Sequence, residues 1–464
     1  MIADQLDGYK YRNSDIEWLG EVPEHWDVGK FGRLAFMQEG PGLRNWQFKD
    51  EGVRVICVTN ITAQGIDFSL LEKFISTEEY QSSYRHFTVV AGDLLLSSSG
   101  NSWGKVARYI GDKEVILNTS TIRVNELTHR PLALDYIELF LQSDCCREQL
   151  GVAMTGSCQP NFGPTHLNRV KTPIPPLEEQ KQIAAFLDYE TAKIDALIEK
   201  QQQLIALLGE KRQAVISHAV TKGLNPDAPM RDSGVEWLGE VPQHWDVSRL
   251  KQITLNPTSG PYGSSLTKSM YTTNGIRVYG QQQAIANDFA MGDYYISPRK
   301  FAEMSRYEVF PGDVLITVMG TIGRVAVVPD DAERGIINPR LVRYQAQRKK
   351  LLPHFLRLSI LGQRSHEWLT LMAQGSTMDG LNMQILGNLP IPFPEVDEQE
   401  AIIKEVKRQN NKFDQMLESA TGIVSLLQER RTALISAAVT GKIDVRGWKP
   451  PASDARLETE MEVA

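Results

Sequence analysis

The sequence predicts an α+β protein made of two copies of one unit, each a mixed α/β domain followed by a long helix. Two observations predict this class. A fifteen-residue segment recurs 219 positions downstream, and each copy contains one long proline-free stretch with apolar residues at heptad spacing. We therefore expect two repeated domains separated by two long helices that form an antiparallel coiled coil, with an internal pseudo-twofold relation.

The composition is that of an ordinary globular protein. The chain has 464 residues, 42% hydrophobic and 23% charged, with a net charge of −7. This charge excludes a chain-wide basic field, the usual footprint of non-specific nucleic-acid binding. Because no apolar run approaches the roughly 20 residues that span a bilayer, and no apolar signal-peptide core follows Met1, we expect a cytoplasmic protein without membrane contact. The four cysteines and eight histidines show no zinc-ligand spacing, so no metal site is expected.

The repeat determines the expected architecture. Ser14–Val28 and Ser233–Val247 share twelve of fifteen residues, and Glu210–Gly223 shares eight of fourteen with Glu429–Lys442. Shorter elements recur at the same offset or one residue from it: AGDLL at 91–95 with PGDVL at 311–315, and Gly104-Lys105-Val106 with Gly323-Arg324-Val325. Chance does not explain so many matches in one order.

The first part of each copy, about 18–175 and 237–392, is rich in turns and short β-type runs. Apolar residues at helical spacing predict helices over Leu134–Leu150 and His354–Leu371. The expected strands are Val53–Thr59, Asp93–Ser97, Val115–Leu117, Ile276–Tyr279, Val314–Val318 and Arg324–Val328.

The second part of each copy reads as one long helix. The stretch 178–220 contains no proline and would be about 64 Å long at about 1.5 Å per residue. Pairing the two helices would bury both stripes; the alternative is two independent amphipathic helices docked on their own domains. The apolar seam positions expected to mediate the coiled coil and partner binding are Ile183, Leu187, Ile194, Leu197, Leu204, Leu208, Ile402, Val406, Phe413, Met416, Ile423 and Leu427.

The resulting expected domains are 1–176, 177–225 (central helix), 226–395, 396–445 (C-terminal helix) and a flexible tail, 446–464. Two similar domains at the ends of a spacer suit a ligand that is itself locally twofold, such as duplex DNA. The near-neutral charge leaves open a scaffold whose domains bind proteins instead.

Several loops hold side chains that can read base edges, although the same residues also occur in ordinary polar turns. Gln and Asn can bond adenine in two places, and Arg or Lys can bond guanine. The candidate DNA-binding residues are Arg44, Asn60, Ser99, Asn101, Ser102, Lys105, Ser157, Gln159, Asn161, Gln281, Gln282, Thr321, Arg324, Arg340, Ser376, Thr377 and Asn382.

The remaining notable residues have mainly structural interpretations. Trp18, Trp26, Trp237 and Trp245 are expected in cores or in joints to the helices, with His25 and His244 in structural hydrogen bonds. Glu179-Gln180 and Glu398-Gln399 open the long helices, where partner contact is an alternative. The basic cluster Arg343, Arg348, Lys349 and Lys350 is either a phosphate-facing patch or a solvated loop.

The chain resembles the specificity subunits of Type I restriction–modification systems. The resemblance rests on EWLGEVPxHWDV at the start of each half, on the hinges IPPLEEQKQI and IPFPEVDEQEAI, and on GNSWGKV and GTIGRV, and it covers about residues 9–445. It implies a non-catalytic subunit whose two target recognition domains each read one half of a split sequence in double-stranded DNA. The two helices would set the gap between the half-sites.

The resemblance also implies partners. Two modification subunits would dock on the helices and methylate adenine at N6, and restriction subunits would join that core. S-adenosylmethionine, ATP and Mg would then bind the partners, with no cofactor on this chain. The sequence agrees, since it contains neither a GxxxxGK[ST] phosphate loop nor an Asn-Pro-Pro-aromatic motif. These missing motifs disfavour a fused restriction–methylation enzyme.

Overall fold

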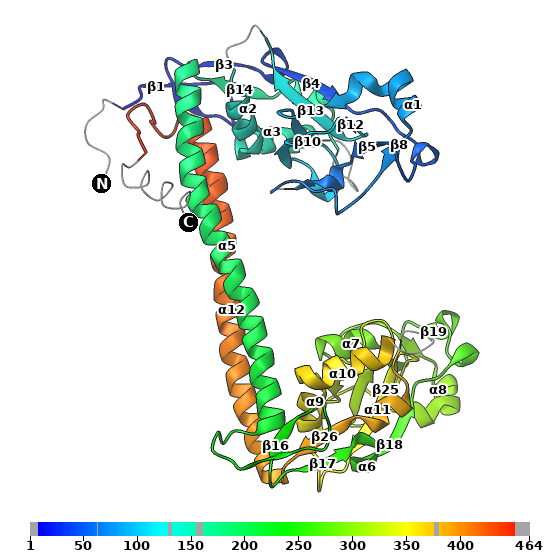
Figure 1. The fold of residues 1–464 in the computed structure, drawn as a ribbon. Coiled ribbons are helices and arrows are strands. Elements are labelled where there is room, and N and C mark those ends of the chain that lie inside the picture. Colours follow the sequence, from blue (N-terminus) through cyan, green and yellow to red (C-terminus); the bar gives the residue numbers. More distant parts are fainter. Residues whose placement is uncertain (1–7, 63, 129–131, 155–160, 375–379, 451–464) are drawn as a thin grey trace. The chain divides into compact units, whose positions relative to one another are not determined.

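The computed structural model describes residues 8–62, 64–128, 132–154, 161–374 and 380–450 (Figure 1). The chain divides into two compact units. Unit 1 comprises residues 1–201 and 422–464, and unit 2 comprises residues 202–421. Each unit therefore contains one mixed domain and a part of both long helices.

Unit 1 holds two four-stranded sheets, ordered β11-β10-β13-β4 and β8-β5-β12-β9. The central strand β10 (Leu94–Ser97) is buried on both faces, as its continuous apolar run requires. The other strands are β1 (Tyr11–Asn13), β2 (Glu21–Pro23), β3 (Asp27–Lys30), β4 (Ala35–Glu39), β5 (Val53–Ile56), β6 (Ile61–Thr62), β7 (Gly65–Ile66), β8 (Phe74–Ile75), β9 (Thr88–Val89), β11 (Val106–Arg108), β12 (Val115–Leu117), β13 (Thr121–Glu126) and β14 (Lys171–Ile174).

The helices of unit 1 cover these sheets and connect them to the long helix. They are α1 (Thr77–Glu79), α2 (Leu134–Gln142), α3 (Asp144–Ala153), α4 (Pro164–Leu167) and the first part of α5 (Leu177–Lys222). The single helix expected over 134–150 is two helices. The chain is extended at Ser143, whose hydroxyl accepts a hydrogen bond from the Cys146 amide and caps α3.

Unit 2 repeats the strand order of the first sheet, as β18-β25-β22-β23. Its second sheet is ordered β19-β21-β20-β24, in which only the three strands β21-β20-β24 match β8-β5-β12 of unit 1. Its strands are β15 (Met230–Asp232), β16 (Glu240–Pro242), β17 (Asp246–Arg249), β18 (Thr254–Ser259), β19 (Tyr271–Thr272), β20 (Ile276–Tyr279), β21 (Tyr295–Ile296), β22 (Val314–Thr317), β23 (Val325–Val327), β24 (Gly335–Ile337), β25 (Leu341–Ala346) and β26 (Pro390–Phe393). Its helices are α6 (Leu250–Ile253), α7 (Gln281–Ala286), α8 (Pro298–Met304), α9 (Pro353–Leu361), α10 (Gln363–Gln374), α11 (Met383–Asn388) and α12 (Val396–Val439). The helix expected over 354–371 is also divided, at Gly362.

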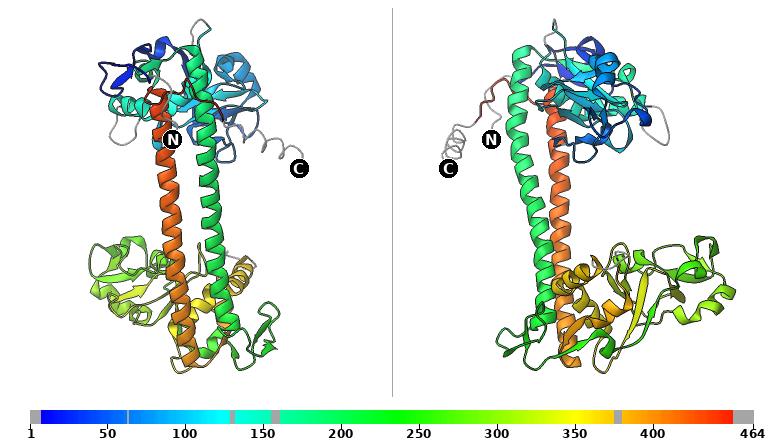
Figure 2. Two further views of the ribbon diagram at one scale, coloured as in Figure 1. Left: turned by 90° about the vertical axis from the view of Figure 1, so that its left-hand side faces the viewer. Right: turned by 45° about the vertical axis from the view of Figure 1, so that its right-hand side comes forward.

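The two long helices pair in antiparallel fashion within each unit, as predicted (Figure 2). In unit 1 the Arg431 guanidinium lies 2.9 Å from the Asp195 carboxylate. In unit 2 the Arg212 guanidinium lies 2.7 Å from the Asp414 carboxylate. The two ion pairs occupy matching positions of the repeat, so both units use one helix-pairing geometry.

The predicted seam needs a correction. Predicted positions that recur every seventh residue, such as Leu187, Ile194, Val406 and Phe413, are buried. Four intermediate predicted positions, by contrast, are exposed, namely Leu197, Leu204, Met416 and Ile423, whereas Ile183 and Ile402 near the helix starts are buried. The inner residues lie one position later, at Thr191, Ile205, Leu417 and Val424, which are buried or half-buried. Buried positions of a heptad seam alternate by three and four residues. Because more residues of each helix are apolar than the seam uses, the sequence does not show which of the two steps follows a given buried position.

The same set of contacts in both units attaches each mixed domain to the helix that follows it. In unit 1 the Trp26 indole N–H donates to the Glu179 carboxylate at 2.5 Å, and the His25 ring lies 2.7 Å from the same group. In unit 2 the equivalent distances from Trp245 and His244 to Glu398 are 3.2 and 2.8 Å. The structural interpretation of these tryptophans and histidines is therefore confirmed.

The adjacent glutamines complete the joint. The Gln180 side chain accepts from the Ala133 amide at 2.7 Å and donates to the Pro175 carbonyl at 2.9 Å. Gln399 likewise accepts from the Leu352 amide at 2.8 Å. Both glutamines are fully buried, which removes them as partner-binding residues.

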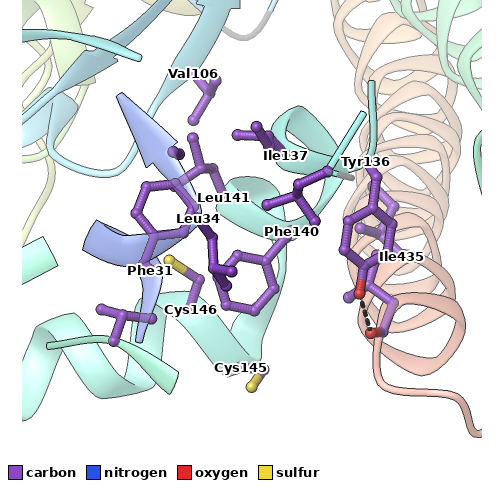
Figure 3. Packing of buried hydrophobic residues seen from close by; sticks show 14 of the residues in the cluster. Phe31, Leu34, Val106, Tyr136, Ile137, Phe140, Leu141, Cys145, Cys146 and Ile435 are labelled. Carbon is purple, nitrogen blue, oxygen red and sulfur yellow. Dashed lines mark hydrogen bonds between the residues drawn. The ribbon is translucent and has the colours of Figure 1, made fainter. Parts of the chain in front are cut away.

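The largest core of unit 1 lies between its antiparallel sheet, α2, α3 and the end of α12 (Figure 3). Phe31 and Phe140 stack with ring centroids 6.1 Å apart. The buried Tyr136 points toward α12, and its hydroxyl donates to the Val439 carbonyl at 3.0 Å. Cys145 and Cys146 lie in this core, where burial raises the pKa of the Cys145 thiol to about 11. Both thiols therefore act as small apolar groups.

The packed part of the chain extends beyond the expected start of the tail at Arg446. Trp448 packs edge-on against Phe186 of α5, with ring centroids 5.5 Å apart, and its carbonyl accepts from Gln182 at 2.5 Å. The flexible-tail prediction is therefore wrong for residues 446–450. Residues 451–464 lie outside the described part of the chain.

Candidate nucleic-acid interface

Four polar segments of unit 1 gather at one end of its two sheets, which we call the loop end. They are the segments after β4, β5 and β10 and the turn before β13. Backbone hydrogen bonds join them: Gly40 N to Thr121 O at 2.9 Å, Asn118 N to Ile56 O at 3.1 Å, and Ser98 N to Ser120 O at 2.9 Å.

Unit 2 builds its loop end in the same way, from the segments after β18, β20 and β22 and the turn before β25. The equivalent bonds are Gly260 N to Leu341 O at 2.9 Å, Asn338 N to Tyr279 O at 2.8 Å, and Val318 N to Arg340 O at 3.0 Å. The same backbone frame thus presents different side chains in the two units.

Two candidates of unit 2 come together at this loop end. The exposed Arg340 donates to the Gln281 side-chain carbonyl at 3.1 Å, and the Gln281 amide donates to the Met319 carbonyl. Gln281 begins α7 and Arg340 precedes β25, so tertiary structure brings together residues 59 positions apart. A guanidinium held by an amide on a rigid strand end is suited to bonding guanine or a phosphate.

Internal hydrogen bonds hold the glycine-containing loop after β22, which carries Thr321 and Arg324. The Thr317 hydroxyl accepts from the Arg324 amide at 2.9 Å and donates to the Thr321 carbonyl at 2.5 Å. Gly323 has φ +71°, a conformation that disfavours a side chain. His366 of α10 lies beside this loop, and burial together with Arg324 lowers its pKa.

The corresponding loop of unit 1 has a similar internal frame. The Gly104 amide donates to the Ser97 carbonyl at 2.7 Å, and the Ser97 hydroxyl lies 3.2 Å from the Ser102 hydroxyl. The Arg147 guanidinium lies 5.6 Å from the centre of the Trp103 ring. The contact between Trp103 and Arg147 of α3 ties the loop to the rest of the domain.

The remaining described candidates of unit 1 lie around this loop. Asn101 and Lys105 are exposed, and Ser99 forms an isolated β-bridge with the exposed Asn161. Met319 and Gly380 form the matching bridge in unit 2. The loop after β10 therefore lies beside the segment that follows α3, which brings the candidates Ser99 and Asn161 together.

The prediction that Asn60 contacts DNA is wrong. Asn60 has an exposed fraction of 0%, its side-chain carbonyl accepts from the Cys57 amide at 2.9 Å, and its amide donates to Asp67 and Leu71 carbonyls at 2.9 Å. Its hydrogen-bonding groups are thus engaged inside the domain, so it cannot read a base edge. Gln283 has the same role in unit 2, where it accepts from the Gly280 amide at 2.8 Å.

Other candidates have mixed placements. Asn382 is exposed, but its side chain caps α11 by accepting from the Ile385 amide at 2.8 Å. Arg44 and Gln282 are exposed. Ser157, Gln159, Ser376 and Thr377 lie outside the described residues.

Two exposed aromatic rings near the loop ends were missed by sequence reasoning. Trp46 is 75% exposed and follows β4, and Tyr262 is 58% exposed and follows β18. The buried Gln47 holds the turn that carries Trp46, by accepting from the Arg44 amide at 2.8 Å and donating to the Tyr84 hydroxyl at 3.0 Å. The signal available in the sequence was that these segments differ most between the copies.

The basic cluster at 343–350 is partly a misinterpretation. Arg343 is buried, and its guanidinium lies 3.7 Å from the Asp313 carboxylate, which accepts from the Phe310 amide at 2.9 Å. Arg123 and Asp93 form the same pair in unit 1 at 3.6 Å. The aspartate of each repeated Gly-Asp element therefore lies beside an arginine, half-buried in unit 1 and buried in unit 2, and the buried Arg343 is unavailable to phosphate.

No metal centre or membrane span is found in the described part of the chain. Its His, Cys, Asp and Glu side chains form no group of three that could hold a metal ion. None of its helices is both long and apolar enough to cross a bilayer.

Comparison with known proteins identifies the likeness. The family described as "Type I restriction modification DNA specificity domain" matches residues 23–206 and 242–418. The MjaX specificity subunit of Methanocaldococcus jannaschii is 26% identical over 450 residues, covering 95% of this chain and 99% of that protein. The EcoBI specificity subunit of Escherichia coli is 24% identical over 282 residues, covering 60% and 59% of the two chains.

A solved structure agrees with the fold. This solved chain comes from a structure described as the structural basis of complex assembly and conformational transition of the type I R-M system. It superposes on the present chain with a TM-score of 0.65 at 15% sequence identity. It covers 91% of this chain and 99% of that chain. At this identity the likeness concerns the fold alone.

Proposed function

The chain belongs to the Type I restriction modification DNA specificity domain family, and on this premise we propose that it reads a bipartite DNA sequence with one half-site per unit. The observation that carries the proposal is the duplicated loop end. Matching backbone bonds hold loops in both units, yet the exposed side chains differ, with Asn101 and Lys105 in unit 1 and Thr321 and Arg324 in unit 2. Identical frames with different polar groups are what two different half-sites require.

The helix pair supports docking of partner subunits in the same proposal. Each unit exposes three apolar side chains on the paired helices, at matching positions of the repeat. In unit 1 they are Leu197, Ile423 and Leu426, and in unit 2 they are Met416, Leu204 and Leu207. Such duplicated strips suit two copies of one partner, and we propose that these are two modification subunits.

The partners would supply the chemistry. We propose that the modification subunits bind S-adenosylmethionine and methylate adenine, and that restriction subunits bind ATP and Mg. In this proposal the present chain contributes sequence choice and assembly, without a catalytic residue of its own.

The paired helices are proposed to set the gap between the half-sites. Inserting seven residues into both α5 and α12 would keep the heptad seam and add about 10 Å at about 1.5 Å per residue. We expect a longer gap in the methylated sequence. An unchanged gap would contradict this part of the proposal.

A domain exchange tests sequence reading directly. Residues 1–176 are replaced by the matching domain of another specificity subunit, and the N6-methyladenine map of the host genome is sequenced. We expect one half of the methylated sequence to change and the other to stay. If both halves change, or neither does, one unit does not read one half-site. If removing the chain leaves the methylation map intact, DNA recognition itself is contradicted.

A further inference from the structure

Unit 2 contains a cavity of about 810 Å³ that the proposed function does not use. It lies between the start of α9, the end of β23, the segment 328–333 and Ile403 of α12. Its lining includes cationic or ionisable basic side chains, namely Arg348, His354 and Arg357, and carboxylates, namely Asp288, Asp330, Asp331 and Glu333. The volume is within the range typical of small-molecule sites.

The cavity is at the opposite end of the sheet from the loop end. Strand β22 begins at Val314, next to the cavity residue Gly312, and ends at Thr317, where the loop that carries Thr321 begins. β23 returns from Arg324 toward the cavity residues Val327 and Val328. Base reading at the loop end therefore does not account for these charges.

The matching region of unit 1 is an internally satisfied ion cluster. Arg108 of β11 lies 2.6 Å from Asp135 and 2.7 Å from Glu138, both on α2. Asp188 of α5 lies near this group. Burial raises the pKa of its carboxyl, Asp135 raises it further, and Arg108 lowers it. Two carboxylates thus pair with one guanidinium.

Unit 2 has basic residues in place of these acids and no central arginine. At the three acidic positions, 219 residues downstream, stand His354, Arg357 and Lys407, and Val327 replaces the central arginine. The Arg357 Nε–H donates to the Val325 carbonyl at 3.0 Å. Among the described residues, no carboxylate lies within 4.0 Å of its guanidinium.

The surroundings of Arg357 and His354 disfavour the charged forms of both side chains. Burial and the nearby Arg212 lower the pKa of Arg357. Burial, Arg357 and Lys407 lower the pKa of His354. A half-buried guanidinium that pairs with no carboxylate among the described residues is less favourable than one that is joined by an anion. The unit 1 cluster shows how this fold satisfies the same place when the counter-charge is part of the chain.

We propose that unit 2 binds a small phosphate monoester in this cavity, with its phosphate held by Arg357 and His354 and its hydroxyl groups directed to the carboxylates that also line the cavity. A phosphate carries a charge of about −1.5 to −2 and three acceptor oxygens, which matches several converging donors better than one carboxylate does. The hydroxyl groups would donate to Asp330, Asp331 or Glu333.

Isothermal titration of the full chain with ribose 5-phosphate tests the proposal, with ribose and inorganic phosphate as comparison probes. We expect ribose 5-phosphate to bind, ribose not to bind, and inorganic phosphate to bind at least tenfold more weakly. Arg357→Leu should weaken ribose 5-phosphate binding at least tenfold. Lys412→Leu removes an equal charge from an exposed position of α12 outside the cavity lining and should leave binding unchanged.

A second variant converts the site to the unit 1 arrangement. Val327→Arg, His354→Asp, Arg357→Glu and Lys407→Asp together should abolish binding while the circular dichroism spectrum stays that of the parent chain. The proposal is overturned if the parent chain binds no phosphate probe, or if Arg357→Leu binds as the parent does. Equal affinity for inorganic phosphate and ribose 5-phosphate would refute the hydroxyl contacts. None of these outcomes depends on DNA recognition.

Discussion

The indole N–H of Trp26 donates to the carboxylate of Glu179 at 2.5 Å, although 153 positions separate the two residues. Trp26 belongs to the repeated N-terminal element, and Glu179 lies in the first turn of α5. Since Trp26 is buried, its N–H has no water to bond instead. One hydrogen bond therefore closes the mixed domain onto the helix that leaves it, and the bond from Trp245 to Glu398 does the same in unit 2.

Replacing Glu179 by Ala should lower the free energy of unfolding of unit 1 by about 2 kcal/mol, because the buried indole N–H loses its acceptor. Urea unfolding followed by tryptophan fluorescence measures the change. Glu178→Ala is the matched control, since the Glu178 side chain is 84% exposed and pairs with Lys181 across the surface; its cost should stay below about 0.5 kcal/mol. Equal effects of the two variants would show that the joint does not depend on Glu179.

A glycine at the end of α12 should not tolerate a side chain. Gly441 has φ +77°, and a Cβ there would overlap the Pro23 ring and lie 3.1 Å from Trp26. We expect Gly441→Ala to cost at least about 1 kcal/mol, from the left-handed backbone and the overlap together. Gly422→Ala, in the middle of α12 with open space around it, should instead stabilise by about 0.5–1 kcal/mol. Thermal unfolding of both variants measures the difference, and a stable Gly441→Ala chain would contradict this packing.

Unit 2 should lose stability as the pH falls below neutrality. Burial is the main cause that lowers the pKa of His354 and His366 below the ordinary value of 6.5. Between the lowered and the ordinary pKa, the unfolded chain binds more protons than the folded chain, so the free energy of unfolding decreases as the pH falls through that window. Urea midpoints at about pH 7.5 and about pH 5.5 measure this change. It should shrink in the His354→Gln, His366→Gln double variant, and an undiminished change would assign the pH dependence to other groups.

Arg324→Ala should weaken DNA binding through unit 2. If Arg324 contacts a phosphate, affinity falls for all sequences and the slope of log K against log salt decreases by about one; if it bonds a base, discrimination at one position falls by about 1–3 kcal/mol. Fluorescence anisotropy with DNA identified by methylation mapping measures both. Arg334→Ala is the control, because Arg334 is exposed, pairs with Glu308 at 2.7 Å and lies outside the loop-end segments. A loss as large for Arg334→Ala would indicate a general charge effect.

Local patterns predicted the elements well where packing only reinforced them. The buried runs that became β10, β20 and β22 end within a residue or two of their predicted limits. The long helices were predicted from spacing and the absence of proline, and α5 spans 46 residues. Patterns failed where a single residue decides the chain direction, as at Ser143, which caps α3 rather than continuing α2.

The candidate interface was predictable only in part. Residue type suggested Asn60 as a base reader, but its side chain bonds the backbone of Cys57, Asp67 and Leu71 inside the domain. The contact between Arg340 and Gln281 depends on β20 and β25 meeting at the loop end. A sequence shows which side chains are able to bond a base, whereas burial decides which of them are free to do so.

By itself the sequence determined the duplication, the family and the two long helices, because identity at a fixed offset and heptad spacing are properties of order along the chain. Tertiary structure alone decided which apolar positions face the partner helix, which polar residues are used inside the domains, and that Arg357 and His354 line a cavity in unit 2 where unit 1 has an ion cluster. These outcomes depend on distances between residues far apart in the chain, and hydrogen bonds and ion pairs act only over a few ångströms.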